Sequence, residues 1–584
     1  MPLPRQIRLH RHPVVDALLL VVAVAVAIFL LQATVARTPR MVVVSDPARF
    51  DAPAALYDTR LLADSFQNRV TGTAAGRVAA AWLVSRFDQL GLAASEQHFP
   101  LVLRGEAREG RNIIARSGGR ERGAIVLLAH YDGPTTSSQS AAASASGVGT
   151  LLELARILES RTHRHPFVYV AVDAGTWGQI GTAHVVDALG GADSVLAAIS
   201  IDHVANGASA GVMISGVGQG PGYAPLWLRA AAADAYARDG TPVQDVGPLQ
   251  EWYLRTIRLS EEDQGPLVAR GIPAINVGTR PANPGYARFL YHTPGDRVET
   301  LDPAAFRQLG AGIERLVLSL DRDQRLRGSF VYLRVGGDRL IRGAAIVVAA
   351  ILLFLPLLFT TWEAIGAARV EPAARTSLRA EAASAIGWWA IAGLGWVALQ
   401  GLAASGLLPR FERYPATERD PFLYDAQWLP ILAWVGAMVA VAYLLSRLRR
   451  RLQLTASHPF AGRAVALATL VVLVAIALVV NPFAAVWLLM LPAWLWPWIG
   501  PTRRAMPGAA GALLVLLSAA PALVIAFLVG QHYELGVRTG WYLFLQSAYG
   551  AWSPLTTVMA VVTLLAAWRL VGTATARLLP DSGD

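Results

Sequence analysis

The stretch GAIVLLAHYD, residues 123–132, decides the fold of the most polar part of this chain. Its first seven residues form an apolar run with the length of a buried strand, and residues 146–158 follow with apolar side chains at helical spacing. Strands that alternate with helices predict an α/β fold, with a mixed, mostly parallel sheet covered by helices on both faces. The same alternation predicts further strands and helices at residues 167–173, 178–189, 195–202, 273–277 and 303–321.

Polar side chains stand where the expected strands end. His130 and Asp132 follow the first strand, Asp173 ends the second, and Asp202 ends the third. The carboxyl ends of parallel strands meet at one edge of a sheet, where open α/β sheets place their binding sites. We therefore expect a site at this edge. His203 comes next to Asp202 and, by strand alternation, is expected to point away from it.

The rest of the sequence is unusually apolar. Of 584 residues, 54% are hydrophobic and 16% charged, and the mean hydropathy is +0.41. A membrane-spanning helix needs about 20 apolar residues. Residues 14–36 meet this requirement as a retained anchor; a cleaved signal peptide is the alternative, which the length of the stretch disfavours. Seven further spans, giving about eight in all, are expected at residues 342–364, 382–405, 427–446, 462–480, 482–499, 508–530 and 551–571.

The charges between these spans predict an orientation. Arginines gather in the loops around Arg375, Arg449 and Arg503 and after the last span, all on the side of the basic N-terminus, whereas loop 406–426 on the other side carries four carboxylates. Basic loops stay in the cytoplasm. The predicted parts are a cytoplasmic N-terminus (1–13), a transmembrane anchor (14–36), an extracytoplasmic domain (37–340), a seven-span domain (341–571) and a cytoplasmic tail (572–584). In a bacterium, this places the chain in the inner membrane and residues 37–340 in the periplasm.

Composition also excludes several functions. The net charge of +10 comes from basic residues beside apolar runs, without a recognition motif, so no nucleic acid is expected as partner. The chain has no cysteine, which excludes thiolate catalysis and cysteine zinc sites. Ionisable residues are few within the spans, so a transporter or lipid-handling bundle is the weakest of three hypotheses.

The order of motifs resembles the co-catalytic di-zinc aminopeptidase family, whose relatives include glutamate carboxypeptidase, transferrin receptor and nicastrin. The resemblance implies that His130 and Asp202 would hold one zinc, that Asp132 would orient His130 from behind, and that His292 would belong to the second zinc. The motifs that carry the resemblance are RVTGT (69–73), RNIIA (111–115), HYD (130–132), SGV (146–148), WGQIGT (177–182), GIPA (271–274) and YHT (291–293).

The sequence departs from this family at the residues that perform its chemistry. The position of the bridging aspartate holds Ala143, and the paired glutamates are replaced by Gly175 and Thr176. A catalytic zinc normally has three protein ligands and a water, and a general base must accept the proton of that water. Possible substitute carboxylates are Asp173, Asp263 and Glu262. His130 and His292 could equally be structural residues, and the Ser/Ala tract 137–146 is interpreted as a flexible loop at the rim.

Two principal hypotheses remain. The first is a membrane-anchored protein with a degraded metal centre, with no zinc or one weakly bound zinc. It would be a non-catalytic binding or scaffolding subunit for a peptide or lipid-linked ligand, with the lipid bilayer and a membrane protein as partners. Its architecture is similar to that of the attachment subunit of the GPI transamidase. The second hypothesis is an active aminopeptidase with two zinc ions that acts on periplasmic peptides.

Overall fold

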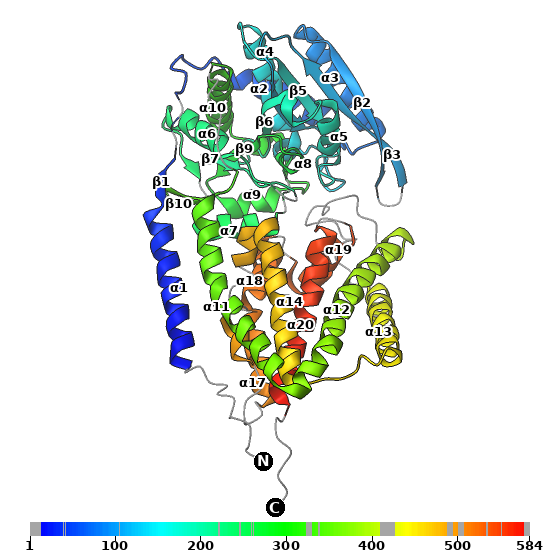
Figure 1. Cartoon of the computed structure of the whole chain (residues 1–584). Helices are drawn as coiled ribbons and strands as arrows, with labels where there is room; N and C mark the ends of the chain where they lie inside the picture. Colours follow the sequence, from blue (N-terminus) through cyan, green and yellow to red (C-terminus); the bar gives the residue numbers. More distant parts are fainter. Residues whose placement is uncertain are drawn as a thin grey trace, which may run out of the picture. The chain divides into compact units, whose positions relative to one another are not determined.

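The computed structural model divides the chain into two compact units, and each is described here by itself (Figure 1). The α/β unit comprises Ala36–Leu340, and the helical unit takes its helices from Met1–Val35, Ile341–Pro409 and Phe422–Asp584. The structure describes residues 13–38, 40, 42–103, 106–219, 222–244, 247–258, 260, 262–322, 330–336, 339–408, 427–486, 494–499, 507–532, 535–549 and 552–576.

An eight-stranded mixed sheet forms the centre of the α/β unit. Its order is β2-β3-β5-β4-β6-β9-β7-β8. The four central strands β5, β4, β6 and β9 run parallel, and β3, β2 and β7 pair antiparallel beside them. The central strands confirm the sequence prediction, whereas β2, β7 and β8 were not predicted. The strands are β2 (Ala94–Leu103), β3 (Glu106–Arg116), β4 (Ala124–His130), β5 (Phe167–Val172), β6 (Val195–Ile201), β7 (Ser209–Ser215), β8 (Val243–Gln244) and β9 (Ala274–Pro281).

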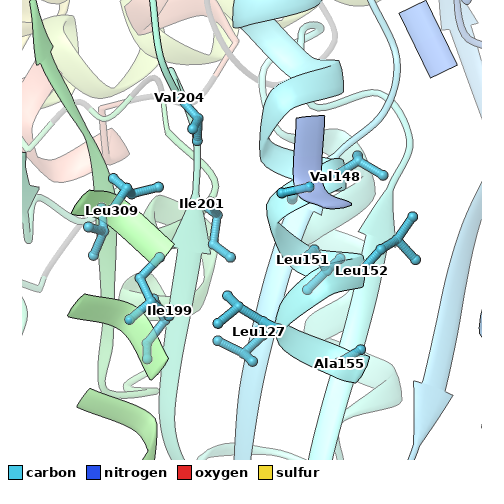
Figure 2. Close-up of a cluster of buried hydrophobic side chains, with 14 of the residues drawn as sticks. Leu127, Val148, Leu151, Leu152, Ala155, Ile199, Ile201, Val204 and Leu309 are labelled. Carbon is cyan, nitrogen blue, oxygen red and sulfur yellow. The ribbon is translucent and has the colours of Figure 1, made fainter. Parts of the chain in front are cut away.

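Helices cover both faces of this sheet. Because side chains alternate along a strand, Leu127 and Ile199 pack on one face against α4 and its neighbours, where Leu309 of α10 joins the core (Figure 2). The other face packs against α5 and α8. The helices of the unit are α2 (Ala52–Ser65), α3 (Ala74–Gln89), α4 (Ser146–Glu159), α5 (Ile180–Ala188), α6 (Leu226–Ala237), α7 (Pro248–Ile257), α8 (Gln264–Ala269), α9 (Pro284–Leu290) and α10 (Pro303–Arg322). Short 3-10 turns lie at Ala192–Ser194 and Val298–Thr300.

The Ser/Ala tract is the clearest error of the sequence analysis in this unit. Residues 137–146 were expected to be a flexible loop, but Ala141–Ala145 form a buried π-helix, η1, that continues directly into α4. Small side chains allow this segment to pack closely against α2 and β4. The prediction failed because composition alone does not distinguish a polar loop from a tightly packed turn of small residues.

The helical unit contains most of the apolar sequence. Its helices are α1 (Pro13–Ala33), α11 (Gly343–Val370), α12 (Pro372–Ala404), α13 (Trp428–Arg451), α14 (Pro459–Val480), α15 (Pro482–Ala484), α17 (Gly508–Ser518), α18 (Ala520–His532), α19 (Thr539–Ala548) and α20 (Pro554–Thr575). Single 3-10 turns lie at Trp496–Trp498 and Gly536–Arg538. A small sheet, most of whose residues belong to the α/β unit, has the order β1-β11-β10, with strands Val35–Arg37, Arg339–Arg342 and Tyr332–Gly336.

Several of these helices are long and apolar enough to cross a membrane. Of six such helices among the described residues, α11, α12, α13, α14 and α20 lie in the helical unit, and the sixth, Ala141–Glu159, is 94% buried in the α/β unit. The helices α17 and α18 meet at an angle of 48° and qualify together as a broken span or a re-entrant loop, at the position where a span was expected over 508–530. The expected span 482–499 is described only by α15 and the turn Trp496–Trp498. The residues of loop 409–426, Arg503 and Arg504 lie outside the described residues.

Candidate functional site

The sheet brings the predicted polar residues to one edge. His130 is the last residue of β4, and Asp173 and Asp202 directly follow β5 and β6. Since these three strands are parallel neighbours, their carboxyl ends coincide. Asp263, immediately before α8, approaches from the covering layer, and its Oδ2 lies 3.3 Å from Nδ1 of His130. His130 and Asp263 are 7% and 1% exposed, so this pair is buried.

The charge on His130 follows from this environment. Burial alone would lower the pKa of its imidazole, but Asp202, the hydrogen bond to Asp263 and the nearby Asp132 outweigh burial and raise the pKa to about 10. His130 therefore carries a positive charge at neutral pH when only these carboxylates surround it, and Asp263 is the one within 3.3 Å.

Asp132 organises the turn that replaces the paired glutamates. Its Oδ1 accepts a hydrogen bond from the backbone N–H of Gly175 at 2.8 Å, and its Oδ2 accepts one from the N–H of Thr176 at 3.2 Å. Burial raises the pKa of Asp132 to about 7, against the opposing charge of His130. A Cβ at position 175 would stand 2.4 Å from Cβ and 2.6 Å from Cγ of His130. The His130 side chain thus occupies the space that a side chain at position 175 would need.

The carboxylate of Asp173 likewise accepts hydrogen bonds from groups of the domain itself. Its Oδ1 accepts hydrogen bonds from the Thr71 hydroxyl and the Ala174 N–H, both at 2.8 Å, and its Oδ2 accepts one from the Arg111 N–H at 3.0 Å. Burial raises the pKa of Asp173, although these hydrogen bonds oppose the shift. With three donors on two oxygens, Asp173 ties β3 to β5.

Asp296 holds the segment where the bridging aspartate was expected. Its two oxygens accept hydrogen bonds from the N–H groups of Ala142 at 2.7 Å and Ala143 at 3.2 Å. Nearby, the buried Arg69 guanidinium donates to the carbonyls of Tyr131 and Gln139 at 2.9 and 2.8 Å. Asp296 and Arg69 were not among the predicted site residues, although Arg69 begins the motif RVTGT (69–73) and Asp296 lies three residues after the motif YHT (291–293). Both stabilise the backbone around the site.

Asp202 pairs with its neighbour. Its Oδ1 accepts the His203 N–H at 2.7 Å, and its Oδ2 lies 3.6 Å from Nε2 of His203. The expectation that His203 points away was wrong, because His203 has left-handed backbone (φ 52°) and no longer follows strand alternation. Glu262 accepts a hydrogen bond from Nε2 of Gln264 at 2.8 Å, and burial raises the pKa of Glu262.

His292 follows α9 and is 2% exposed. Its ring stacks on Tyr291 with centroids 3.7 Å apart, and its carbonyl accepts the Thr136 hydroxyl at 2.7 Å. Throughout the described part of the chain, no group of three or more His, Cys, Asp or Glu side chains is arranged to hold a metal ion. The donor set therefore does not fit a zinc centre in this arrangement.

A second polar layer lies beneath this edge. Ser200 of β6 and Asn276 of β9 are paired in register, and Ser215 of β7 is the partner of Asn276 on the other side. Gln264 Nε2 lies 3.4 Å from the Ser215 hydroxyl. Among the described residues, Ser200 Oγ, Asn276 Oδ1 and Gln264 Oε1 are buried without a hydrogen-bond partner. The polar edge therefore extends into the sheet, and a polar residue within each apolar strand is the sequence signal for it.

The fold and this edge define an α/β domain of the zinc-aminopeptidase type. Residues 112–317 match the sequence model of Peptidase family M28, so the α/β unit contains an M28 domain, as the sequence motifs predicted. A comparison with curated proteins gives no match.

The solved structures to which this chain is similar include enzymes of two kinds. A zinc aminopeptidase from Bacillus subtilis is 16% identical, with a TM-score of 0.40, and the alignment covers 49% of this chain and 98% of that one. A glutaminyl cyclase from Porphyromonas gingivalis is 23% identical, with a TM-score of 0.40 and coverage of 46% and 98%. An aminopeptidase from Aneurinibacillus sp. strain AM-1 is 14% identical, with a TM-score of 0.40 and coverage of 48% and 96%.

Proposed function

We propose that this chain is an integral membrane protein whose M28 domain binds or scaffolds a ligand and does not hydrolyse peptides. The observation that carries the proposal is the packing of His130 against Gly175. A glutamate at position 175 would require its Cβ within 2.4 Å of His130, so the site cannot regain that side chain without moving His130.

The hydrogen bonds of the carboxylates support the same conclusion. Asp132, Asp173 and Asp296 each direct their oxygens to N–H or O–H donors of the domain itself. A carboxylate that accepts several such bonds would lose them on turning towards a metal ion, and the donors would remain buried and unpaired. These residues therefore favour a structural role over coordination.

The membrane assignment rests on the helical unit. The apolar lengths of α11 and α14, with mean hydropathies of 2.6 and 2.7, suit helices that cross a bilayer. With arginines at the cytoplasmic ends of the spans, the M28 domain would be periplasmic in the inner membrane of a bacterium. A helical unit of this size exceeds what an anchor requires, which favours a membrane-protein partner or a peptide or lipid-linked ligand.

A zinc measurement tests this proposal. The full chain would be purified, loaded with zinc, desalted and analysed by mass spectrometry for metal, beside a His130→Ala/Asp202→Ala control. We expect no zinc above the control and no release of amino acids from a panel of aminoacyl-coumarin substrates. About two zinc ions per chain, lost in the control, would overturn the proposal and establish the di-zinc aminopeptidase alternative.

The zinc measurement could also show a site for a single zinc ion. His130, Asp202 and Asp263 gather at one edge, and a zinc ion could displace the proton of His130 if the metal bound strongly enough. About one zinc per chain together with substrate turnover would also refute a non-catalytic role. One zinc without turnover would leave that role standing and assign the metal to structure.

A further inference from the structure

The strongest unassigned feature of the chain is a cluster of arginines where α12 begins and α13 ends. The last turns of α13 contain Arg447, Arg449, Arg450 and Arg451, and the first turns of α12 contain Arg375 and Arg379. We call these six residues the arginine cluster. A direct contact joins the two groups.

Arg449 makes that contact. Its Nη1 donates to the Ser384 hydroxyl at 3.0 Å and its Nη2 donates to the Ala380 carbonyl at 3.2 Å, both on α12. The adjacent arginines of α13 are consequently held beside the first turns of α12. Arg449 is partly buried, whereas Arg375, Arg379, Arg450 and Arg451 are exposed.

The buried carboxylate beside this cluster, Glu381, is occupied elsewhere, and Glu371 at the N-cap of α12 forms no ion pair with the cluster among the described residues. Glu381 of α12 is 4% exposed and binds Arg569 of α20, with Oε2 accepting from Nε at 3.1 Å and Oε1 pairing with Nη2. The Ser457 hydroxyl also donates to Glu381, at 2.9 Å. A Cβ at Gly462 would stand 2.4 Å from the Arg569 guanidinium, so α14 closes over this pair. Glu381 therefore neutralises Arg569 and contributes nothing to the surface.

The exposed arginines keep their charge uncompensated. Among the described residues, Arg375, Arg379, Arg450 and Arg451 have no carboxylate partner. Arg447 donates to the Tyr443 hydroxyl at 2.9 Å and lies over its ring, an arrangement typical of side chains that reach from an apolar helix towards polar headgroups. A ligand for this surface must bring negative charge.

Helix geometry gives the depth of the cluster in a bilayer. From Trp428 to Arg447, α13 rises by about 29 Å at 1.5 Å per residue, close to the thickness of about 30 Å of a hydrocarbon core. Trp428 is 70% exposed at one end and Tyr443 is 51% exposed near the other, as in the aromatic belts of membrane proteins. The arginine cluster thus falls at the level of lipid headgroups.

We propose that the arginine cluster binds the phosphate of an anionic phospholipid between the ends of α12 and α13. This inference rests on the membrane insertion included in the proposed function, and not on the absence of zinc. Clustered basic residues beside a spanning helix attract anionic lipids, and each arginine near the surface raises the affinity for such lipids by about fivefold.

The test uses the full chain in lipid nanodiscs containing equal amounts of dioleoyl phosphatidylglycerol and dioleoyl phosphatidylcholine. Native mass spectrometry of the released protein counts each lipid that remains bound. The variant Arg450→Gln/Arg451→Gln removes two exposed charges of the cluster. The matched control, Arg339→Gln/Arg342→Gln, removes two exposed arginines that come just before the start of α11. The arginines of α12 come after the end of that helix.

We expect the native chain to retain phosphatidylglycerol in preference to phosphatidylcholine. In the cluster variant, the ratio of bound phosphatidylglycerol to bound phosphatidylcholine should fall by about 25-fold, because each of the two removed arginines contributes about fivefold. The control should keep it. Equal melting temperatures of both variants in pure phosphatidylcholine would show that folding is intact. Equal retention of both lipids by the native chain, or an equal loss in the control, would overturn the inference.

Two further outcomes separate the sources of failure. Inorganic phosphate at 10 mM should leave the bound lipid in place; a protein that retains inorganic phosphate and no phosphatidylglycerol would assign the site to free anions and overturn the inference. Extraction of the chain from membranes by alkaline carbonate would refute the proposed membrane insertion itself. A chain that resists extraction but shows no lipid preference would refute the lipid site alone.

Discussion

The packing of His130 against Gly175 makes Gly175→Ala the most informative single substitution. The added Cβ would lie 2.4 Å from Cβ of His130, whereas carbon atoms pack at about 3.5–4.0 Å, so His130 must move by about 1 Å or more. That movement changes the contact of 3.3 Å between His130 and Asp263. Overpacking of this kind costs about 1–3 kcal/mol.

Thermal unfolding of the full chain, followed by tryptophan fluorescence and by trypsin cleavage within the α/β unit, measures this effect. We expect the melting temperature of that unit to fall by at least about 3 °C, since each kcal/mol corresponds to about 2–4 °C in a domain of this size class. Gly118→Ala is the matched control, because its Cβ would meet nothing within 4 Å. If Gly175→Ala melted with the native chain, His130 would not be pressed against this turn, and the argument for the proposed function would fail.

Three further substitutions test the charged groups. His130→Gln should destabilise the chain most below pH 6.5 and progressively less as pH rises through about 10, because a pKa raised by folding contributes stability that is lost when the imidazolium deprotonates; a pH-independent difference in melting temperature would contradict this. Asp296→Asn should cost about 1–3 kcal/mol by weakening charge-assisted bonds to two backbone N–H groups of η1, measured by urea unfolding, and no change would deny it that role. Glu381→Gln should lower the melting temperature of the helical unit by weakening the bond to Arg569, while Glu371→Gln should not; equal effects would refute a specific pair.

The elements that could be predicted are those whose apolar residues recur with the regular spacing of a strand or a helix. The apolar runs of β4, β5 and β6 and the helical spacing of α4 gave their positions within one or two residues, and parallel strands then placed His130, Asp173 and Asp202 at one edge. These inferences need only local spacing and the geometry of a sheet.

The partners of these residues could not be predicted in the same way. Asp296 lies more than 150 residues from the N–H groups of Ala142 and Ala143 that it binds, and no local pattern signals such a contact. Likewise, the bond between Glu381 and Arg569 joins residues 188 positions apart. His203 escaped prediction because its left-handed backbone breaks the alternation on which the expectation depended.

The polar residues at the edge of the sheet bear on the proposed function in one further respect. Asp132 binds the backbone N–H groups of Gly175 and Thr176, which follow β5. Asp173 binds the N–H of Ala174, also after β5, and the N–H of Arg111 within β3. Replacement of either aspartate by alanine would leave buried donors unpaired, at about 1–3 kcal/mol for each group. These aspartates are therefore explained by the folding of the domain, and their presence in the sequence is not evidence for hydrolysis. Under the proposed function, these acidic residues would keep the edge of the sheet in shape as a binding surface without any hydrolysis.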